Sequence, residues 1–203
     1  MKAFLEKIAE RLVKKFSDSM ENMAVVLPSK RSVVFLKSHL SKLIDNPIFL
    51  PKFFSIEEFI EELSGYRVAD NLSLQFYLYH SYLESPPNQI DTFEKFMSWS
   101  SILLHDFNEI DRSLVDAKLV FTNLREVKEL ENWNLEDWSF NAENLTDSQE
   151  KYVSFYNQLY NWYLSFNKIL SDKQLAYQGM AYKKVASEIE DKILEWEKVW
   201  FVG

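Results

Sequence analysis

The sequence of 203 residues contains no cysteine, and this absence removes several kinds of chemistry. Without cysteine the chain has no disulfide, no thiolate zinc site and no cysteine nucleophile. Glycine occurs 3 times and proline 5 times, too rarely for a sandwich or barrel of many short strands joined by tight turns. Apolar residues make up 47% of the chain. We therefore expect a folded and mainly helical protein.

Long hydrophobic runs are also missing. No window approaches 18 apolar residues, so we expect no membrane span. The first residues, MKAFLEKI, meet a charge every two or three positions and lack the apolar core of a signal peptide. Together with the lack of cysteine, these features predict a cytoplasmic protein.

Charge is unevenly distributed along the chain. The 23 Lys/Arg and 31 Asp/Glu give a formal net charge of −8. Residues 1–52 hold 10 basic and 5 acidic residues, whereas the remainder holds 13 basic and 26 acidic residues. A surface that faces phosphate is therefore expected near the N-terminus, and the acidic remainder favours a protein-facing role.

Residues 24–36, AVVLPSKRSVVFL, have the layout of a nucleotide-binding strand, turn and helix. A phosphate-binding loop needs glycines, a lysine and a Ser/Thr that holds magnesium. This turn has no glycine, and Pro28 donates no amide hydrogen. We expect no NTP hydrolysis here and no cofactor in the chain. Lys30 and Arg31, at the start of the helix, remain placed to meet a phosphate of DNA.

The order of predicted elements gives the fold class. Apolar residues recur at helical spacing over 4–16 and 33–44, on either side of a short apolar run at 23–27. Residues 52–54 form a second predicted strand, and the sequence SIEE at 55–58 is a capping box that starts a helix ending near Gly65. This alternation, closed by a strand at 199–202, predicts an α/β, mostly helical fold with a small parallel sheet.

A large all-α insertion separates the second and last strands. Helical periodicity covers residues 71–83, 93–114, 148–170 and 179–197. The predicted domains are an α/β core of residues 1–66 with 180–203 and a helical insertion of residues 67–179. Because the chain stops directly after an apolar strand, we expect the sequence to be part of a longer protein.

Polar clusters in the insertion offer little chemistry. Asp106 and Glu109 share a helix face, which leaves open a metal-dependent nuclease, but nothing else completes a shell. Asp106 and Asp111 are expected to be cap or ion-pair residues with Arg112 as a local partner, and no metal site is predicted. The histidines His39, His80 and His105 occur singly within predicted helices.

Aromatic residues mark a packing surface and a candidate interface. A stripe from Tyr152 to Leu170 has no Lys or Arg between 152 and 167, so core packing is favoured over stacking on single-stranded DNA. Trp133, Trp138 and Phe140 lie in a predicted connection, and we expect this aromatic segment to contact a neighbouring domain or partner.

Taken together, four stretches resemble the amino-terminal region of AddB-like proteins, large partners in bacterial helicase-nuclease complexes. These stretches are FLEKIA (4–9), VVLPSKR (25–31), PKFFSIEEF (51–59) and LLHDFNEIDR (103–112). The resemblance continues through GMAY (179–182) to WFVG (200–203) and so covers nearly the whole chain. It implies an inactivated superfamily I helicase module with a P-loop-helicase-like sheet, followed in the parent by a PD-(D/E)XK nuclease module.

This resemblance also implies the chain's role and partners. In active helicases of this superfamily the first strand, turn and helix bind ATP, and the later strand-turn-helix matched by Lys52 to Phe59 helps to contact DNA. The nuclease residues would lie beyond Gly203, so no catalytic residue is carried over. The implied function is a scaffold in double-strand break repair and recombination. Its expected partners are DNA and an AddA-like motor subunit. The residues chosen as candidate DNA contacts are Lys30, Arg31, Lys52 and Ser55, which form two turn-and-helix-start pairs that a parallel sheet would place at one edge.

Two other functions stay open at this point. One is an enzyme, either a divergent NTPase or a metal-dependent nuclease that uses Asp106 and Glu109. The other is a helical adaptor that binds a protein through the aromatic residues between 133 and 166 and never contacts DNA.

Overall fold

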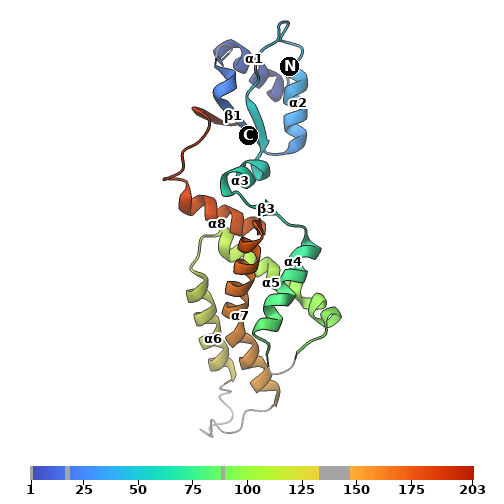
Figure 1. The fold of residues 1–203 in the computed structure, drawn as a ribbon, viewed down its shortest axis with the longest axis vertical. Coiled ribbons are helices and arrows are strands. Elements are labelled where there is room, and N and C mark those ends of the chain that lie inside the picture. The colour runs from blue at the N-terminus through green and yellow to red at the C-terminus, as the bar shows by residue number, and fades with distance from the viewer. Residues whose placement is uncertain (1, 17–18, 88–89, 133–146) are drawn as a thin grey trace. The chain divides into compact units, whose positions relative to one another are not determined.

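The computed structural model describes residues 2–16, 19–87, 90–132 and 147–203. The chain forms two compact units (Figure 1). Unit 1 comprises Met1–Ser64 with Ser187–Gly203, and unit 2 comprises Gly65–Ala186. None of the helices in the described ranges combines the length and the apolar character that crossing a bilayer requires.

Unit 1 is built on a three-stranded parallel sheet. Its elements are α1 (Phe4–Phe16), η1 (Met20–Asn22), β1 (Met23–Leu27), α2 (Lys30–Leu40), β2 (Lys52–Ser55), α3 (Ile56–Ser64) and β5 (Lys198–Phe201). β1 pairs in parallel with β2 on one side and with β5 on the other, so the strand order is β2-β1-β5. All five residues of β1 are buried, as expected for a strand covered on both faces. The predicted α/β, mostly helical fold with a small parallel sheet is confirmed.

Each face of this sheet has its own apolar cover. Val25 and Leu27 share one face and belong to a buried cluster with Leu12 of α1 and Leu36 of α2. Figure 1 shows these two helices beside the strands. Side chains alternate along a strand, so Phe54 lies on the opposite face. There its ring centroid is 5.6 Å from that of Phe59 of α3 and 5.2 Å from that of Trp196.

Local signals fix where α3 begins and ends. The Glu58 N–H donates to Ser55 Oγ at 3.2 Å, and the Ser55 N–H donates to Glu58 Oε2 at 2.9 Å. These reciprocal bonds are the predicted capping box. After Ser64, Gly65 adopts φ +69°, the left-handed conformation that ends a helix with little strain in glycine.

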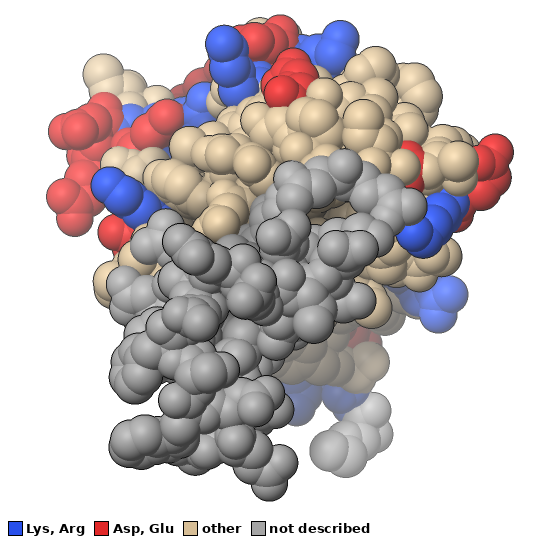
Figure 2. All heavy atoms as spheres, turned by 90° about the horizontal axis from the view of Figure 1, so that it is seen from below, with Lys and Arg blue, Asp and Glu red and all other residues tan. Residues whose placement is uncertain are grey.

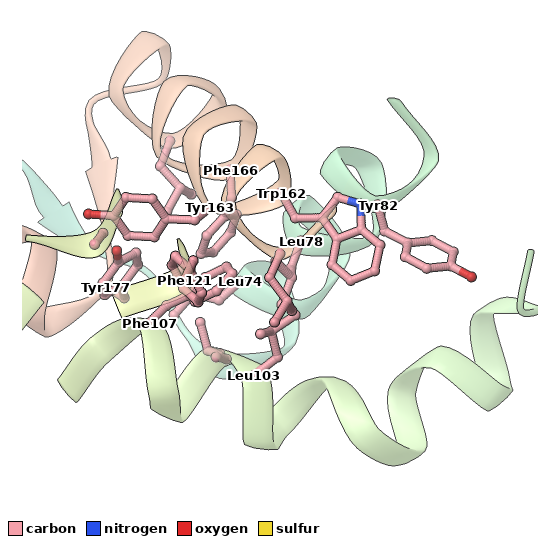
Figure 3. Packing of buried hydrophobic residues seen from close by; sticks show 14 of the residues in the cluster. Leu74, Leu78, Tyr82, Leu103, Phe107, Phe121, Trp162, Tyr163, Phe166 and Tyr177 are labelled. Atoms are coloured by element: carbon pink, nitrogen blue, oxygen red, sulfur yellow. The ribbon is translucent and has the colours of Figure 1, made fainter. Parts of the chain in front are cut away.

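Unit 2 is a helical assembly with a two-stranded parallel ladder. Its elements are β3 (Arg67–Val68), α4 (Asn71–Glu84), α5 (Phe93–Arg112), α6 (Ala117–Asn132), α7 (Asp147–Asp172), β4 (Leu175–Ala176) and α8 (Gln178–Glu188). Figure 3 shows the core, in which Trp162 and Phe166 of α7 face Leu78 of α4 and Phe107 of α5. The aromatic stripe predicted for α7 therefore supplies core residues, at least from Phe155 onward.

Several helix boundaries differ from the sequence-based prediction. The helix predicted for 33–44 begins earlier, at Lys30, and ends at Leu40. The helix predicted for 93–114 ends at Arg112, and Leu114 at φ 56° precedes α6. The helix predicted for 179–197 is wrong in its second half, because α8 ends at Glu188. The chain must leave the helix there for Trp196 to pack on Phe54 and for β5 to begin at Lys198. Helical periodicity within residues 189–197 carries no information about that distant contact.

The first turn of α8 is tied closely to α5 within unit 2. The Gly179 N–H donates to Asn108 Oδ1 at 2.7 Å. A Cβ at Gly179 would lie 2.2 Å from the Asn108 carbonyl oxygen, so only glycine allows this approach. Residues 180–186, which the predicted division at 179/180 gave to the core, lie in unit 2.

The close approach at Gly179 gives a first prediction. Gly179→Ala should lower the stability of unit 2 by about 2 kcal/mol or more, because backbone atoms of α5 must move to make room for the methyl group. Thermal unfolding followed by circular dichroism measures the change. Gln178→Ala, one residue earlier in the same turn, is the matched control and should shift stability by less than about 0.5 kcal/mol. Equal stability of the two variants would contradict the close packing.

Candidate functional site

The turn after β1 is closed by its own side chains. Ser29 caps α2, and its Oγ accepts a hydrogen bond from the Ser32 N–H at 3.3 Å. The hydroxyl oxygens of Ser29 and Ser32 lie 3.0 Å apart. In a phosphate-binding loop, backbone amides at this position point at the phosphate oxygens. Here the Ser32 N–H donates to the Ser29 hydroxyl and Pro28 has no N–H, so two of the backbone donors that a phosphate-binding loop would offer are absent.

Two cationic side chains, Lys30 and Arg31, follow this turn, and they differ in whether they form an ion pair. The Lys30 side chain is 71% exposed, and its Nζ lies 3.2 Å from Glu58 Oε1. An exposed pair of this kind is held weakly and is readily exchanged for another anion. Arg31 is exposed and has no ion-pair partner among the residues that the structure describes. Arg31 is therefore the more available cation at this edge of the sheet.

Glu58 balances the charge beside this turn. The Ser55 N–H, which donates to its carboxylate, lowers the pKa of Glu58, and the nearby Lys30 ammonium lowers it further. Glu58 is thus ionised at neutral pH and offsets one of the two cations. The edge of the sheet where Lys30 and Arg31 lie is only weakly basic.

Two of the four predicted DNA contacts, Ser55 and Lys52, do not lie free beside Lys30 and Arg31 as the sequence indicated. Ser55 is only 1% exposed, and its Oγ is used in the capping box with Glu58, so it has no free group for DNA. Lys52 is the first residue of β2 and pairs with Ala24, whereas Ser55 pairs with Leu27 at the other end of the strands. Lys52 therefore lies at the opposite edge of the sheet from Lys30.

Lys52 is also engaged by neighbours within unit 1. Its Nζ lies 2.8 Å from Glu62 Oε1 and 5.3 Å from the ring centroids of both Phe54 and Trp196. The hydrogen bond from Lys52 to Glu62 raises the pKa of Lys52. Its contacts are those of a side chain that covers the aromatic face of the sheet, and they leave Lys52 a poor candidate for a DNA contact.

Charges of both signs are mixed on the surface. On the face drawn in Figure 2, Lys and Arg lie next to Asp and Glu around an uncharged area. Unit 2 as a whole has 11 Lys/Arg and 17 Asp/Glu, a net charge of −6. A nucleic-acid surface is typically a basic stripe, so the helical unit is a poor candidate for contact with phosphate.

The acidic cluster on α5 does not converge on a metal. Among the described residues, no three His, Asp or Glu side chains lie close enough together to hold a metal ion. Glu109 Oε1 lies 3.9 Å from Arg112 and accepts a hydrogen bond from Asn108, while Asp106 lines a different part of the surface. The single histidines His80 and His105 are exposed, and His39 is half-buried.

Asp111 forms a buried polar cluster that the sequence did not indicate. Its carboxylate is 1% exposed and accepts hydrogen bonds from Tyr163 at 2.5 Å, from Lys183 at 2.8 Å and from Tyr177. Figure 3 shows Tyr163 and Tyr177 side by side at one end of the core. Asp111 is thus an ion-pair residue, as predicted, but its partner is Lys183 of α8 and not Arg112, which pairs with Glu109. The same prediction is wrong for Asp106, which makes no cap hydrogen bond or ion pair to the residues that the structure describes.

The chemistry of this cluster is structural. Burial raises the pKa of Tyr177 well above its ordinary value, and the negative charge of Asp111 and the hydrogen bond to it add to this effect. Burial likewise raises the pKa of Tyr163. Both phenols therefore stay protonated and serve as donors. The cluster joins α5, α7 and α8 through one carboxylate.

The aromatic residues Trp133, Trp138 and Phe140, expected to contact a partner, lie outside the described residues. Their proposed role is therefore still a prediction from the sequence.

The tyrosine cluster generates a pH-dependent prediction. Because the pKa of Tyr177 is raised in the folded state, its contribution to stability is complete below pH 10 and is lost as the pH rises further. We expect the unfolding temperature to fall steeply above about pH 10. Tyr177→Phe should lower stability at pH 8 by about 1–3 kcal/mol through loss of a buried donor and should flatten the decline above pH 10.

The control for this experiment is Tyr182→Phe. Tyr182 is a half-buried tyrosine of α8 with no hydrogen bond among the described residues, and its removal should leave the alkaline decline unchanged. An equally steep decline in Tyr177→Phe and in the parent chain would show that Tyr177 does not cause it.

Comparisons of the chain with protein-family models, with curated proteins and with solved structures find no match.

Proposed function

We propose that this chain is a non-catalytic, helicase-like scaffold of an AddB-like helicase-nuclease subunit that takes part in double-strand break repair in the cytoplasm. The observation that carries the proposal is the turn after β1. It keeps the strand, turn and helix of an ATP site, yet Ser29 Oγ takes the Ser32 amide and no glycine is present. A motor needs this turn open to a triphosphate, whereas a scaffold needs only the shape of the sheet.

Two features support the roles within this proposal. Lys30 and Arg31 start α2 at the carboxyl edge of a parallel sheet, where ligands of open α/β folds bind, so they are the candidate contacts to single-stranded DNA. Unit 2, with a net charge of −6, is better suited to face a protein such as an AddA-like motor subunit than to face DNA.

Nucleotide binding tests the decayed ATP site. With a fluorescent ATP analogue and magnesium, the 203-residue chain should show no saturable binding below about 1 mM, since no backbone cradle holds the phosphates. Titration by fluorescence anisotropy measures this. Saturable binding that is lost in Lys30→Ala and kept in Lys42→Ala, an exposed lysine beyond α2, would overturn the proposal in favour of a divergent NTPase.

DNA binding tests the remaining basic pair. We expect salt-sensitive binding of a fluorescein-labelled oligodeoxythymidine and a loss of about tenfold or more in affinity in the double variant Lys30→Glu/Arg31→Glu. The slope of log affinity against log salt should become shallower by about 1.4, because two phosphate contacts of about 0.7 each are lost.

The matched control is Lys14→Glu/Lys15→Glu in the last turn of α1, which changes the net charge by the same amount. An equal loss in both double variants would mean that only net charge matters. Absence of any binding by the parent chain would remove DNA from the proposal and favour an adaptor that contacts protein alone.

A further inference from the structure

Unit 2 contains a cavity that the proposed function does not use. Its volume is about 630 Å³, which is within the range of cavities that hold small molecules. Lys95, Trp99 and Asp106 line it from α5, where their spacing places them along one side of the helix. Side chains of α4, of α6, of α7 and of the segment before α5 complete the lining.

Aromatic rings form much of the wall. The aromatic lining residues are Tyr82, Trp99, Phe121, Phe155 and Tyr156. The ring centroid of Trp99 lies 6.0 Å from that of Tyr82 and 5.5 Å from that of Phe155, so the three rings form one contiguous group. Aromatic rings attract cations through their negative faces and also bury apolar groups, and this combination is typical of sites for organic ammonium ions.

Asp91 holds this wall in place and has little charge left for a ligand. Its Oδ1 accepts from Lys95 Nζ at 2.6 Å, and its Oδ2 accepts from Trp99 Nε1 at 3.1 Å. The Asp91 N–H in turn donates to the Tyr82 hydroxyl at 2.8 Å. Both carboxylate oxygens are thus committed, and they fix the positions of Lys95 and Trp99.

Asp106 is the carboxylate of the cavity lining that makes no hydrogen bond or ion pair to another described residue. Burial raises the pKa of Asp106, and the neighbouring His105 opposes this by lowering it, so the shift reflects partial loss of hydration that is offset only by a charge on the same helix. Since Lys95 and Asp91 neutralise each other, the lining has a net charge of −1 from Asp106, inside a unit of net charge −6.

From this combination of an aromatic wall and one unpaired carboxylate, we infer that the cavity binds a small organic cation with an apolar or aromatic body, its ammonium group next to Asp106. The rings take the apolar body, and the carboxylate discriminates against neutral and anionic molecules of the same shape. This inference does not depend on the proposed scaffold function, because no residue of unit 1 takes part in it.

The test uses benzyltrimethylammonium as the probe and the intact 203-residue chain. In NMR spectra of protein labelled with ¹⁵N at tryptophan, the indole N–H signal of Trp99 should shift saturably as the probe is added. This signal is assigned as the one that is missing from the spectrum of Trp99→Phe. Benzyl alcohol and benzenesulfonate, at equal ionic strength, should bind more weakly by about tenfold or more. Equal affinity for benzyl alcohol, or no saturable shift with the cation, would overturn the inference.

A matched pair of variants locates the charge. Asp106→Asn should weaken binding of the cation by about five- to tenfold while leaving benzyl alcohol unaffected. Glu109→Gln removes the same charge from the same helix outside the cavity lining and should change the affinity less than about twofold. Both residues are exposed, so thermal unfolding should confirm that both variants are folded. Identical affinities in Asp106→Asn and the parent chain would rule out Asp106 as the recognition group.

Discussion

Parallel pairing of β1 with both of its neighbours is the constraint on which the rest of the fold depends. A parallel neighbour cannot be reached by a tight turn, so each pairing requires a crossover. The crossover from β1 to β2 contains α2 and places Lys30 and Arg31 directly after the central strand. The connection from β2 to β5 begins with α3 and contains all of unit 2. A strand buried along its whole length thus determines both the position of the turn that carries Lys30 and Arg31 and the place of the insertion.

Most of unit 1 could be predicted because its signals are local. The apolar run of β1, the periodicity of α1 and the capping box at Ser55 each act over a few residues, and they give the right elements in the right order. The ladder between β3 and β4 was missed, since two residues per strand leave no period to read. The partners of Asp111 were missed for a different reason. Tyr163 and Lys183 lie 52 and 72 positions away, and no local pattern encodes such contacts.

The candidate site shows how a single residue's position changes its interpretation. Lys52 and Ser55 belong to the same strand of four residues, yet at about 3.3 Å per residue their Cα atoms lie at opposite edges of a short sheet. The sequence indicates the strand but not which of its ends faces the start of α2. The same limit applies to Ser29, because the sequence of the turn does not indicate what its hydroxyl bonds to. Only the geometry of the turn shows that it caps its own helix.

Three carboxylates near α5 show what decides whether a charged group is available to a ligand. Asp111 is surrounded by two phenols and an ammonium, so its hydrogen-bonding capacity is used in joining helices. Asp91 uses both oxygens to position Lys95 and Trp99. Asp106 has only part of its hydration and, among the described residues, no hydrogen bond or ion pair, so that only the nearby His105 opposes the effect of burial on its pKa. The same reasoning sets Arg31 apart from Lys52 in unit 1. Recognition requires a group whose interactions are still unsatisfied in the free protein, because a group already satisfied gains little by exchanging one partner for another.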